Sequence, residues 1–216
     1  MGGNYLIRLY QPGDRAAVRR ICCETADLGR PVEGFFDDRE VFADALTLYY
    51  TDYEPASLWV ALAQGEVAGY LMGCLDTRRY LRLMALKIIP RLILRAFCRG
   101  VFFRRPAWHL FSGALKSARC GSLKRQMDLN KYPAHLHIDI SEKFRGQGMG
   151  RRLIEEFFLY LKGKGISGVH LSTRADSPAC AFFEGMGFKA LGRYPVFFPK
   201  RDGFVFGQSV VYAKLL

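Results

Sequence analysis

The sequence predicts a mixed α/β fold (α+β), in which helices flank both faces of a central sheet of about seven strands. Three observations predict it. Strand-like runs recur at the start, middle and end of the chain, helical periodicity separates them, and a glycine-rich turn joins one strand directly to a strong helix. The chain has 216 residues, of which 50% are hydrophobic, enough for one substantial core. We therefore expect a single domain over residues 1–216.

The first part of the chain is expected to supply three strands and two helices. The expected elements are a strand at 5–9, helices at 14–25 and 38–50, and strands at 57–64 and 67–75. Asp14 is the expected N-cap of the first helix, because it follows a Pro-Gly break. Gly65 lies in the turn of a hairpin between the two later strands.

The last part of the chain returns to alternating strands and helices. The expected elements are a strand at 136–141, a helix at 148–164, a strand at 168–173, a short helix at 177–185 and a closing strand at 209–215. Between the two parts, residues 77–131 show no strand alternation. The order predicts a sheet that is completed only after a long insertion.

The basic residues are concentrated in that insertion. The chain has a formal net charge of +12, and residues 78–131 hold fourteen lysines and arginines against one acid, Asp128. These basic residues are interleaved with Leu, Ile and Phe. Arg91, Arg95 and Arg99 recur every four residues and so share one side of a helix, for which Pro90 permits a new start. We interpret 77–131 as a basic helical insertion.

Three interpretations of the insertion remain open. It could be an amphipathic helix on an anionic membrane surface, or a lid that packs its apolar face over the acceptor site and leaves its arginines solvated. Nucleic-acid binding has the weakest support, because no known module is present. Six scattered cysteines are interpreted as reduced thiols, and we expect no metal. With no signal-peptide run, we expect a cytoplasmic protein, free or peripheral to the inner membrane face.

A glycine-rich turn is the most informative feature. A strand ends at Ser141, and a helix begins after the run Arg145-Gly-Gln-Gly-Met-Gly-Arg151. The start of a helix presents free N–H groups and a partial positive charge, and glycines let a phosphate approach that backbone. The spacing is neither that of a P-loop nor that of a Rossmann turn. The turn therefore predicts a site for a phosphate-bearing ligand.

Arg145-x-x-Gly148-x-Gly150 resembles the acetyl-CoA signature of the GCN5-related N-acetyltransferases (GNAT). The run from Asp176 to Phe188 is similar to that family's Asn-x-x-Ala-x-x-Phe-Tyr-x-x-x-Gly-Phe. Arg8–Asp14 looks like its usual entry into the first helix. Residues 132–139, Tyr-Pro-Ala-His-Leu-His-Ile-Asp, further resemble the acetyltransferase-like domains of O-GlcNAcases and their free-standing bacterial relatives.

The resemblance implies that acetyl-CoA is the co-substrate and an amine the acceptor. The strand ending at Ser141 would splay from the strand beginning at Gly168, and the pantetheine arm would hydrogen-bond there to the backbone of Asp139 and Ile140. The pyrophosphate would lie on the amides of Arg145, Gly146, Gln147, Gly148, Met149, Gly150 and Arg151. The short helix and its entry would contribute Asp176, Ala179 and Phe183.

Direct acetyl transfer needs a general base. Alternation places His135, His137 and Asp139 on one face of their strand, so a histidine lies beside a carboxylate. Asp139 is our first candidate and His137 the second, although the two could instead form a structural polar pair.

The expected acid for the CoA thiolate is missing. Phe183 occupies the position at which the family often has a Tyr, and Tyr194 or water is the alternative donor. Two functions therefore remain: an N-acyltransferase acting on a small amine, an amino sugar or a protein lysine, and a non-catalytic acetyl-CoA-binding module that docks through its basic insertion.

Overall fold

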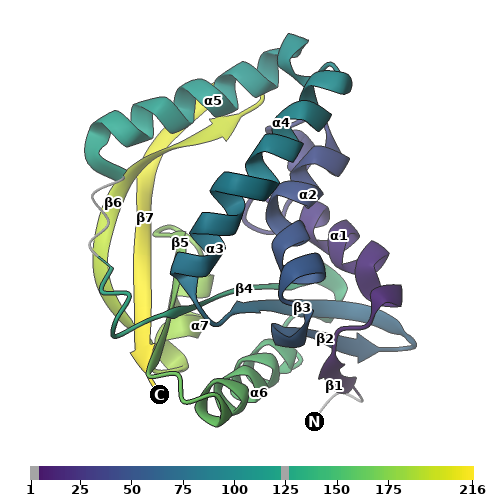
Figure 1. Ribbon diagram of the computed structural model, residues 1–216, viewed down its shortest axis with the longest axis vertical. Coiled ribbons are helices and arrows are strands. Elements are labelled where there is room, and N and C mark those ends of the chain that lie inside the picture. The colour runs from purple at the N-terminus through teal and green to yellow at the C-terminus, as the bar shows by residue number, and fades with distance from the viewer. Residues whose placement is uncertain (1–4, 123–126) are drawn as a thin grey trace.

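The computed structural model describes residues 5–122 and 127–216, and its strands form one open seven-stranded sheet (Figure 1). The strand order is β1-β2-β3-β4-β5-β7-β6. The strands are β1 (Tyr5–Leu9), β2 (Leu58–Ala63), β3 (Glu66–Cys74), β4 (Ala134–Ile140), β5 (Gly168–Arg174), β6 (Lys189–Lys200) and β7 (Gly203–Leu215). The helices are α1 (Arg15–Glu24), α2 (Arg39–Leu48), α3 (Thr77–Leu83), α4 (Ile89–Cys98), α5 (Arg105–Ser117), α6 (Met149–Gly163) and α7 (Ala179–Gly185).

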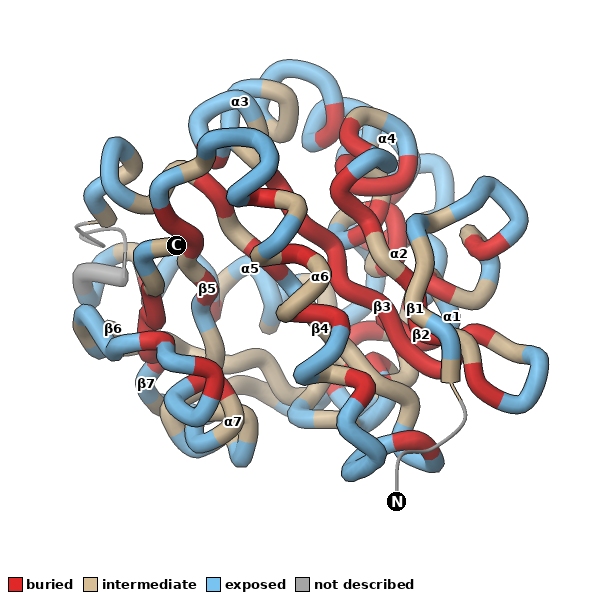
Figure 2. The backbone as a smooth tube through the Cα atoms, turned by 90° about the horizontal axis from the view of Figure 1, so that it is seen from below, coloured by how far each residue is buried: buried red, intermediate tan, exposed pale blue. Residues whose placement is uncertain are grey.

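Helices cover both faces of this sheet, as Figure 1 shows with α1 and α2 above β2–β4 and α6 below them. On the first face, α1 packs through side chains such as Ile21, and α2 through Leu48 at its end. On the other face, α6 and α7 pack through side chains such as Phe157 and Phe183. Figure 2 shows β3 as a nearly continuous buried strand. The predicted fold class is confirmed.

The sheet opens between β4 and β5. These two strands are parallel and pair only at their beginnings, where Ala134 lies opposite Val169 and His135 opposite His170. On its other side, β4 stays paired with β3 along its whole length. The splay predicted for the middle of the sheet is therefore present, and it leaves one edge of β4 without a strand partner.

The insertion is helical in the part that the structure describes; Lys124 and Arg125 lie outside the described residues. Pro90 lies in the first turn of α4, as predicted, but the helix does not break before it. A π-helical turn at Met84–Ile88 joins α3 to α4 and ends two residues before Pro90. Such a turn shifts the backbone hydrogen-bond pattern at the point where proline has no N–H to donate.

The insertion is attached at two places. Arg99 Nε donates to Asp38 Oδ2 at 2.7 Å, and Arg95 pairs with Asp44, so these arginines join α4 to α2 rather than being solvated. Further along, α5 lies against the edge strand β6, where the Phe197 N–H donates to Ser117 Oγ at 2.8 Å. That bond gives a partner to an N–H that an edge strand would otherwise leave unpaired.

Two local predictions need correction. Asp14 immediately precedes α1, but its side chain does not cap the helix; it pairs with Arg8 and accepts the Gln11 N–H at 2.8 Å. The closing strand is also longer than predicted, because β6 and β7 form a hairpin over 189–215. Its tip, with the run Phe197-Phe198-Pro199-Lys200-Arg201-Asp202-Gly203, lacks clear period-two alternation.

Candidate functional site

A cleft of about 770 Å³ occupies the opening between β4 and β5. Its walls come from the end of α1, the splayed halves of β4 and β5, the turn before α6, and the start of α7. His137 and Asp139 line it from the α1 face of the sheet, and Phe182 and Phe183 line it from the α7 face. The cleft therefore connects the glycine turn with the polar side chains of β4.

The unpaired edge of β4 presents main-chain groups to this cleft. The Ser141 N–H donates to the Ala68 C=O, so residue 141 points toward β3. Because successive residues of a strand point to opposite sides, the backbone groups of Asp139 also face β3, and those of Ile138 and Ile140 face the opening. The main chain of Asp139 is therefore turned away from the cleft, contrary to the role expected for it, and the main chains of Ile138 and Ile140 face the cleft.

The turn before α6 has the geometry that its glycines predicted. Gly146 and Gly148 have φ values of +76° and +84°, a region that residues with a Cβ rarely adopt. Gly150, the second residue of α6, lies so close to α7 that a Cβ would be 3.3 Å from Phe182 Cζ. The first turn of a helix has N–H groups without intrahelical acceptors, here beginning at Met149. These groups lie at the mouth of the cleft.

Two arginines add positive charge to this mouth. Arg151 lines the cleft. Arg145 Nε donates to the Ile140 C=O at 3.0 Å, and its guanidinium lies against Gly29, where a Cβ would be 2.6 Å from a guanidinium nitrogen. Arg152 instead pairs with Glu156 at 2.8 Å. An anionic ligand would thus meet main-chain N–H groups and two cationic side chains.

A polar group formed by three side chains lies on the α1 side of the cleft. Asp139 Oδ2 accepts hydrogen bonds from Tyr70 Oη at 2.7 Å and from His137 Nε2 at 2.9 Å. An ionised carboxylate only accepts hydrogen bonds, so His137 carries its proton on Nε2 when neutral. Its Nδ1 is then the nitrogen that can accept a proton. The His137 side chain is 45% exposed, and that of Asp139 is 21% exposed.

The surroundings change the acidity of this group. Burial lowers the pKa of His137, but the charge of Asp139 and its hydrogen bond raise it by more, so the pKa lies above its ordinary value. Burial, followed by the charge of Asp139, raises the pKa of Tyr70 far above its usual range. Tyr70 therefore stays protonated and donates to the carboxylate.

His135 is excluded as the general base. Its two ring nitrogens contact Tyr50 Oη at 2.9 Å and Thr77 Oγ1 at 2.8 Å. Burial, followed by the charges of His170 and His137, lowers the pKa of His135 to about 3. It is a neutral histidine with both nitrogens occupied, and the alternation of β4 alone did not distinguish it from His137.

Not every predicted site residue reaches the cleft. Tyr194 lies on β6 outside the cleft lining, and its hydroxyl is turned toward Gly192. Gln147 and Asp176 also do not line the cleft, and Asp176 pairs with Arg174 at 2.7 Å. The remaining predicted residues line it: His137, Asp139, Ile140, Arg145, Gly146, Gly148, Met149, Gly150, Arg151, Ala179 and Phe183.

Sequence reasoning missed Tyr70 and a charged contact over the α1 end of the cleft. Asp27, in the loop after α1, pairs with Arg174 of β5 at 3.3 Å and with Lys200 of β6 at 2.6 Å. The neighbouring Thr25 and Ala26 line the cleft. These pairs join residues far apart in the chain, for which a single sequence carries no signal.

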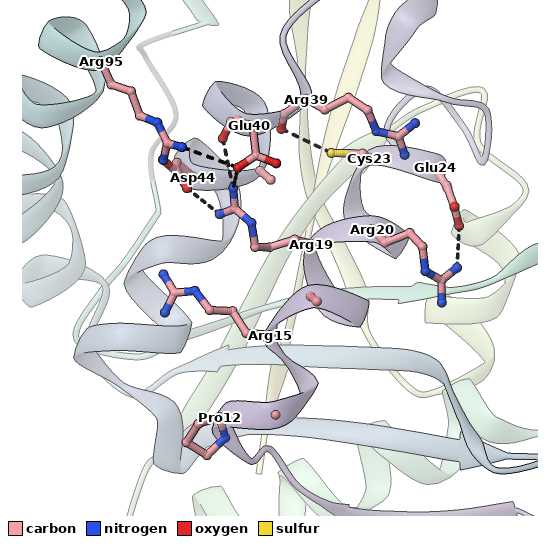
Figure 3. A pocket seen from close by; sticks show the side chains of 13 residues that line it. Pro12, Arg15, Arg19, Arg20, Cys23, Glu24, Arg39, Glu40, Asp44 and Arg95 are labelled. Carbon is pink, nitrogen blue, oxygen red and sulfur yellow. Dashed lines mark hydrogen bonds and ion pairs between the residues drawn. The ribbon is translucent and has the colours of Figure 1, made fainter.

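A second hollow, of about 840 Å³, lies between α1, α2 and α4 (Figure 3). Its arginines already have acidic partners. Arg19 and Arg95 both pair with Asp44 and Glu40, and Arg20 pairs with Glu24. The ion pairs that line this hollow form a structural network, which holds α4 against α1 and α2.

Comparisons with known proteins agree with this geometry. Residues 115–190 match the sequence model of the acetyltransferase (GNAT) domain. The Mus musculus protein named probable N-acetyltransferase family 8 member 5 is 30% identical over 96 residues, a stretch that spans 40% of this chain and 40% of that relative. The matched domain includes the glycine turn, and each of the two matches covers less than half of this chain.

Solved structures match over nearly the whole length. The crystal structure of SsHAT is 28% identical, with 98% of both chains covered and a TM-score of 0.73. The structure of yncA from Salmonella typhimurium with its cofactor acetyl-CoA is 14% identical, covers 98% of this chain and 94% of that one, and has a TM-score of 0.59. The latter likeness shows the fold alone.

The fold and the splayed cleft are those of the GNAT acetyltransferases, and residues 115–190 match the model of that domain. The predicted family resemblance is confirmed. The matched domain supports acetyl transfer from acetyl-CoA as the general chemistry. The narrower resemblance to the domains of O-GlcNAcases stays a prediction.

Proposed function

We propose that this protein transfers the acetyl group of acetyl-CoA directly to an amine, with His137 as the general base. The observation that carries the proposal is the single cleft that joins a glycine turn suited to phosphates with the His137–Asp139 pair. Direct transfer requires both substrates to meet in one cavity. The pyrophosphate would lie at the turn, and the pantetheine would extend along Ile140 and Ile138 of β4.

The reaction follows from these positions. The amine nitrogen attacks the thioester carbonyl carbon, a C–N bond forms, and the C–S bond breaks to release CoA thiolate. His137 Nδ1 accepts the proton that the attacking nitrogen loses. Asp139 stabilises the resulting imidazolium through Nε2, and Tyr70 holds the carboxylate in place. The sequence favoured Asp139 as the base, but its Oδ2 already has two donors, so Asp139 positions His137.

The leaving group needs no dedicated acid in this proposal. Phe183 is buried against Phe188 and Tyr212, and it has no proton to give. Tyr194 does not line the cleft. A thiol resembling cysteine has a pKa of roughly 8.5, so a thiolate is a tolerable leaving group, and water can protonate it afterwards.

The acceptor class is a small amine, an amino sugar or a protein lysine. The loop that begins at Gly29 would shape its pocket, whereas no described residue of the insertion lines the cleft. The side chains that line the α1 end of the cleft include Ser172, Arg174 and Thr25, which supply hydrogen-bond donors and acceptors. A polar acceptor fits such a lining better than an apolar one.

Release of free CoA from acetyl-CoA, measured with a panel of amines, tests the proposal. Wild-type protein should release CoA in the presence of its acceptor and form the acetylated amine. His137→Gln should bind acetyl-CoA normally and lose roughly a hundredfold or more in rate, because a general base contributes about that factor. An unchanged rate in this variant would remove His137 from the mechanism.

The alternative is a non-catalytic acetyl-CoA-binding module, which the aromatic Phe183 favours. This module would bind acetyl-CoA through the same cleft and release no CoA with any amine. Binding without turnover in wild-type protein, across small amines, amino sugars and lysine peptides, would establish it in place of the enzyme.

A further inference from the structure

The insertion exposes apolar side chains that the domain does not cover. Helix α4 packs on the domain through Leu92 and Ala96, and on the opposite side of the helix Ile93, Leu94 and Phe97 are exposed. Their exposed fractions are 53%, 64% and 62%. The lid interpretation expected this apolar face to pack inward. The structure instead turns the uncharged side of α4 to solvent.

Helix α5 repeats this arrangement. It contacts the β6–β7 hairpin through Gly113 and Ser117. Trp108, Phe111 and Leu115 recur at intervals of three and four residues, so they share the other side of the helix. They are 61%, 64% and 45% exposed, and Phe103 between the two helices is 83% exposed. The docking face is defined as Ile93, Leu94, Phe97, Phe103, Trp108, Phe111 and Leu115.

A face of this kind is uncommon on a soluble monomer. Single exposed apolar residues are normal, but a large contiguous set marks an interaction site. Six of the seven side chains come from two consecutive helices, and Phe103 comes from the short Val101–Phe103 turn that joins them. Trp108 presents its ring while its Nε1 donates to the Phe102 C=O at 2.9 Å, so exposing the ring leaves no polar group unpaired.

Positive charge borders the docking face. Arg105 lies three residues before Trp108, and Arg119 lies four residues after Leu115. Arg82 lies in α3, one turn before Leu86, which is 72% exposed but outside the docking face. Within the described residues, no acidic side chain forms an ion pair with these three arginines. The acidic side chains near α4 form ion pairs with the arginines on its inner side; they are Asp38, Glu40 and Asp44.

We propose that the docking face binds the surface of an anionic phospholipid bilayer. Exposed aromatic and aliphatic side chains insert into the interfacial region of a bilayer, and unpaired arginines are attracted to its anionic lipids. A second copy of this chain would bring the same positive charge to the contact. Nucleic acid would use the arginines but leave the aliphatic side chains Ile93 and Leu94 without a partner.

The helices would lie in the plane of the membrane. Helices α4 and α5 have 10 and 13 residues, and each residue adds about 1.5 Å of length. Their lengths are therefore roughly half of the thickness of the hydrocarbon core, or slightly more than half. In the part of the chain that the structure describes, no helix is long and apolar enough to cross a bilayer. The apolar side chains would enter the headgroup region while the arginines contact lipid phosphates.

Vesicle sedimentation and tryptophan fluorescence test this proposal without any assay of acetyl transfer. The chain has two tryptophans, so Trp59→Phe leaves Trp108 as the only reporter. Vesicles of phosphatidylcholine with phosphatidylglycerol should sediment this protein and shift the Trp108 emission to shorter wavelength. Phosphatidylcholine alone should bind it at least about tenfold more weakly, because each basic residue at the surface contributes about 1 kcal/mol.

Two variants separate the apolar and the electrostatic contributions. The triple change Phe97→Ser, Phe103→Ser and Phe111→Ser should weaken binding to anionic vesicles at least about tenfold. The triple change Arg82→Gln, Arg105→Gln and Arg119→Gln should abolish the preference for anionic lipid. Leu159→Ser on α6, where the side chain is 62% exposed, is the matched control and should change nothing.

Each of three results would overturn the proposal. Equal binding to neutral and anionic vesicles would remove the role of charge, and absence of binding to both would remove the membrane. A dimer in lipid-free solution that shifts the Trp108 emission would assign the face to a second copy. Retained binding of acetyl-CoA by the variants shows that they are folded.

Discussion

At the residue scale, the chemistry rests on one carboxylate oxygen with two donors. Asp139 Oδ2 lies between Tyr70 Oη and His137 Nε2, and this arrangement determines which imidazole nitrogen stays free. The same contact raises the pKa of His137 despite the opposing effect of burial. A histidine of raised pKa is a stronger base, but it must lose its proton before each turnover, so the transfer rate should rise with pH through that pKa.

Asp139→Asn should lower the pKa of His137. The change removes the negative charge and leaves the burial that disfavours the imidazolium, so the pKa should fall below its ordinary value. NMR titration of the ring protons of the four histidines measures this directly. The acid limb of the rate profile should move to lower pH with it. An unchanged His137 pKa would show that the carboxylate does not act on the imidazole.

The same interaction contributes to stability with a definite sign. A folded-state pKa above the unfolded value stabilises the fold below the unfolded pKa, and this stabilisation is lost as pH rises through the folded pKa. The stability difference between wild type and Asp139→Asn that arises from His137 should therefore be larger at pH 5 than at pH 9. These two pH values lie on either side of the unperturbed histidine pKa of about 6.5.

Tyr70→Phe should move the His137 pKa in the other direction. Without the tyrosine hydroxyl, the carboxylate loses one donor and interacts more strongly with the imidazolium, so the pKa of His137 should rise further. The rate at neutral pH should fall while the KM for acetyl-CoA stays unchanged, because Tyr70 does not line the cleft. A change in acetyl-CoA affinity with an unaltered His137 titration would assign Tyr70 a purely structural role.

At the element scale, the splay of β4 from β5 creates the ligand cleft. Hydrogen bonding to β3 holds β4 in place, so its other edge is free to bind a ligand as an added strand would. The turn before α6 then places helix N–H groups at the end of that edge. Positive φ values at Gly146 and Gly148 are the condition for this turn.

Gly148→Ala should weaken acetyl-CoA binding about tenfold, the equivalent of losing one charge-assisted hydrogen bond. The added Cβ strains a residue at φ +84° in the turn that lines the cleft, and so disturbs the main-chain N–H groups expected to meet the phosphates. Gly165→Ala is the matched control, because Gly165 has φ +69°, open space around a Cβ and a position outside the cleft.

Both glycine variants should lose about 1 kcal/mol of unfolding free energy from backbone strain. Only Gly148→Ala should lose affinity for acetyl-CoA in calorimetry. Equal affinities in the two variants would show that the turn does not contact the phosphates.

Local patterns predicted the elements better than their ends and contacts. The glycine spacing predicted the turn before α6, and alternation placed His137 and Asp139 on one face. Alternation could not show that the backbone of Asp139 faces β3, because that depends on the pairing of β4 with a particular neighbour. The continuous helix through Pro90 was missed because a π-turn is not visible in a periodicity of 3.6 residues.

At the scale of the whole molecule, the N-terminal and C-terminal parts build one site together. The sheet joins strands from before and after the insertion, and Asp27 pairs with Arg174 across 147 positions of sequence. Tyr70 meets Asp139 in the same way, between β3 and β4. Such contacts depend on the assembled topology, so the sequence did not predict the partners of the residues it singled out.

The insertion gives the molecule a second surface, apart from the cleft. Its inner side is tied to α2 by Arg95 and Arg99, and its outer side is apolar. If the outer side rests on a membrane, acetyl transfer takes place next to that surface. Acceptors at or near an anionic bilayer would then reach the cleft at a raised local concentration.

Isothermal titration of acetyl-CoA into the folded protein tests the central claim most directly, with Gly148→Ala and Gly165→Ala titrated in parallel. We expect a saturable one-to-one isotherm for wild type and Gly165→Ala and a weaker one for Gly148→Ala. An absence of binding heat across a range of temperatures, in wild-type protein that unfolds cooperatively, would contradict the assignment of the β4–β5 cleft as an acetyl-CoA site.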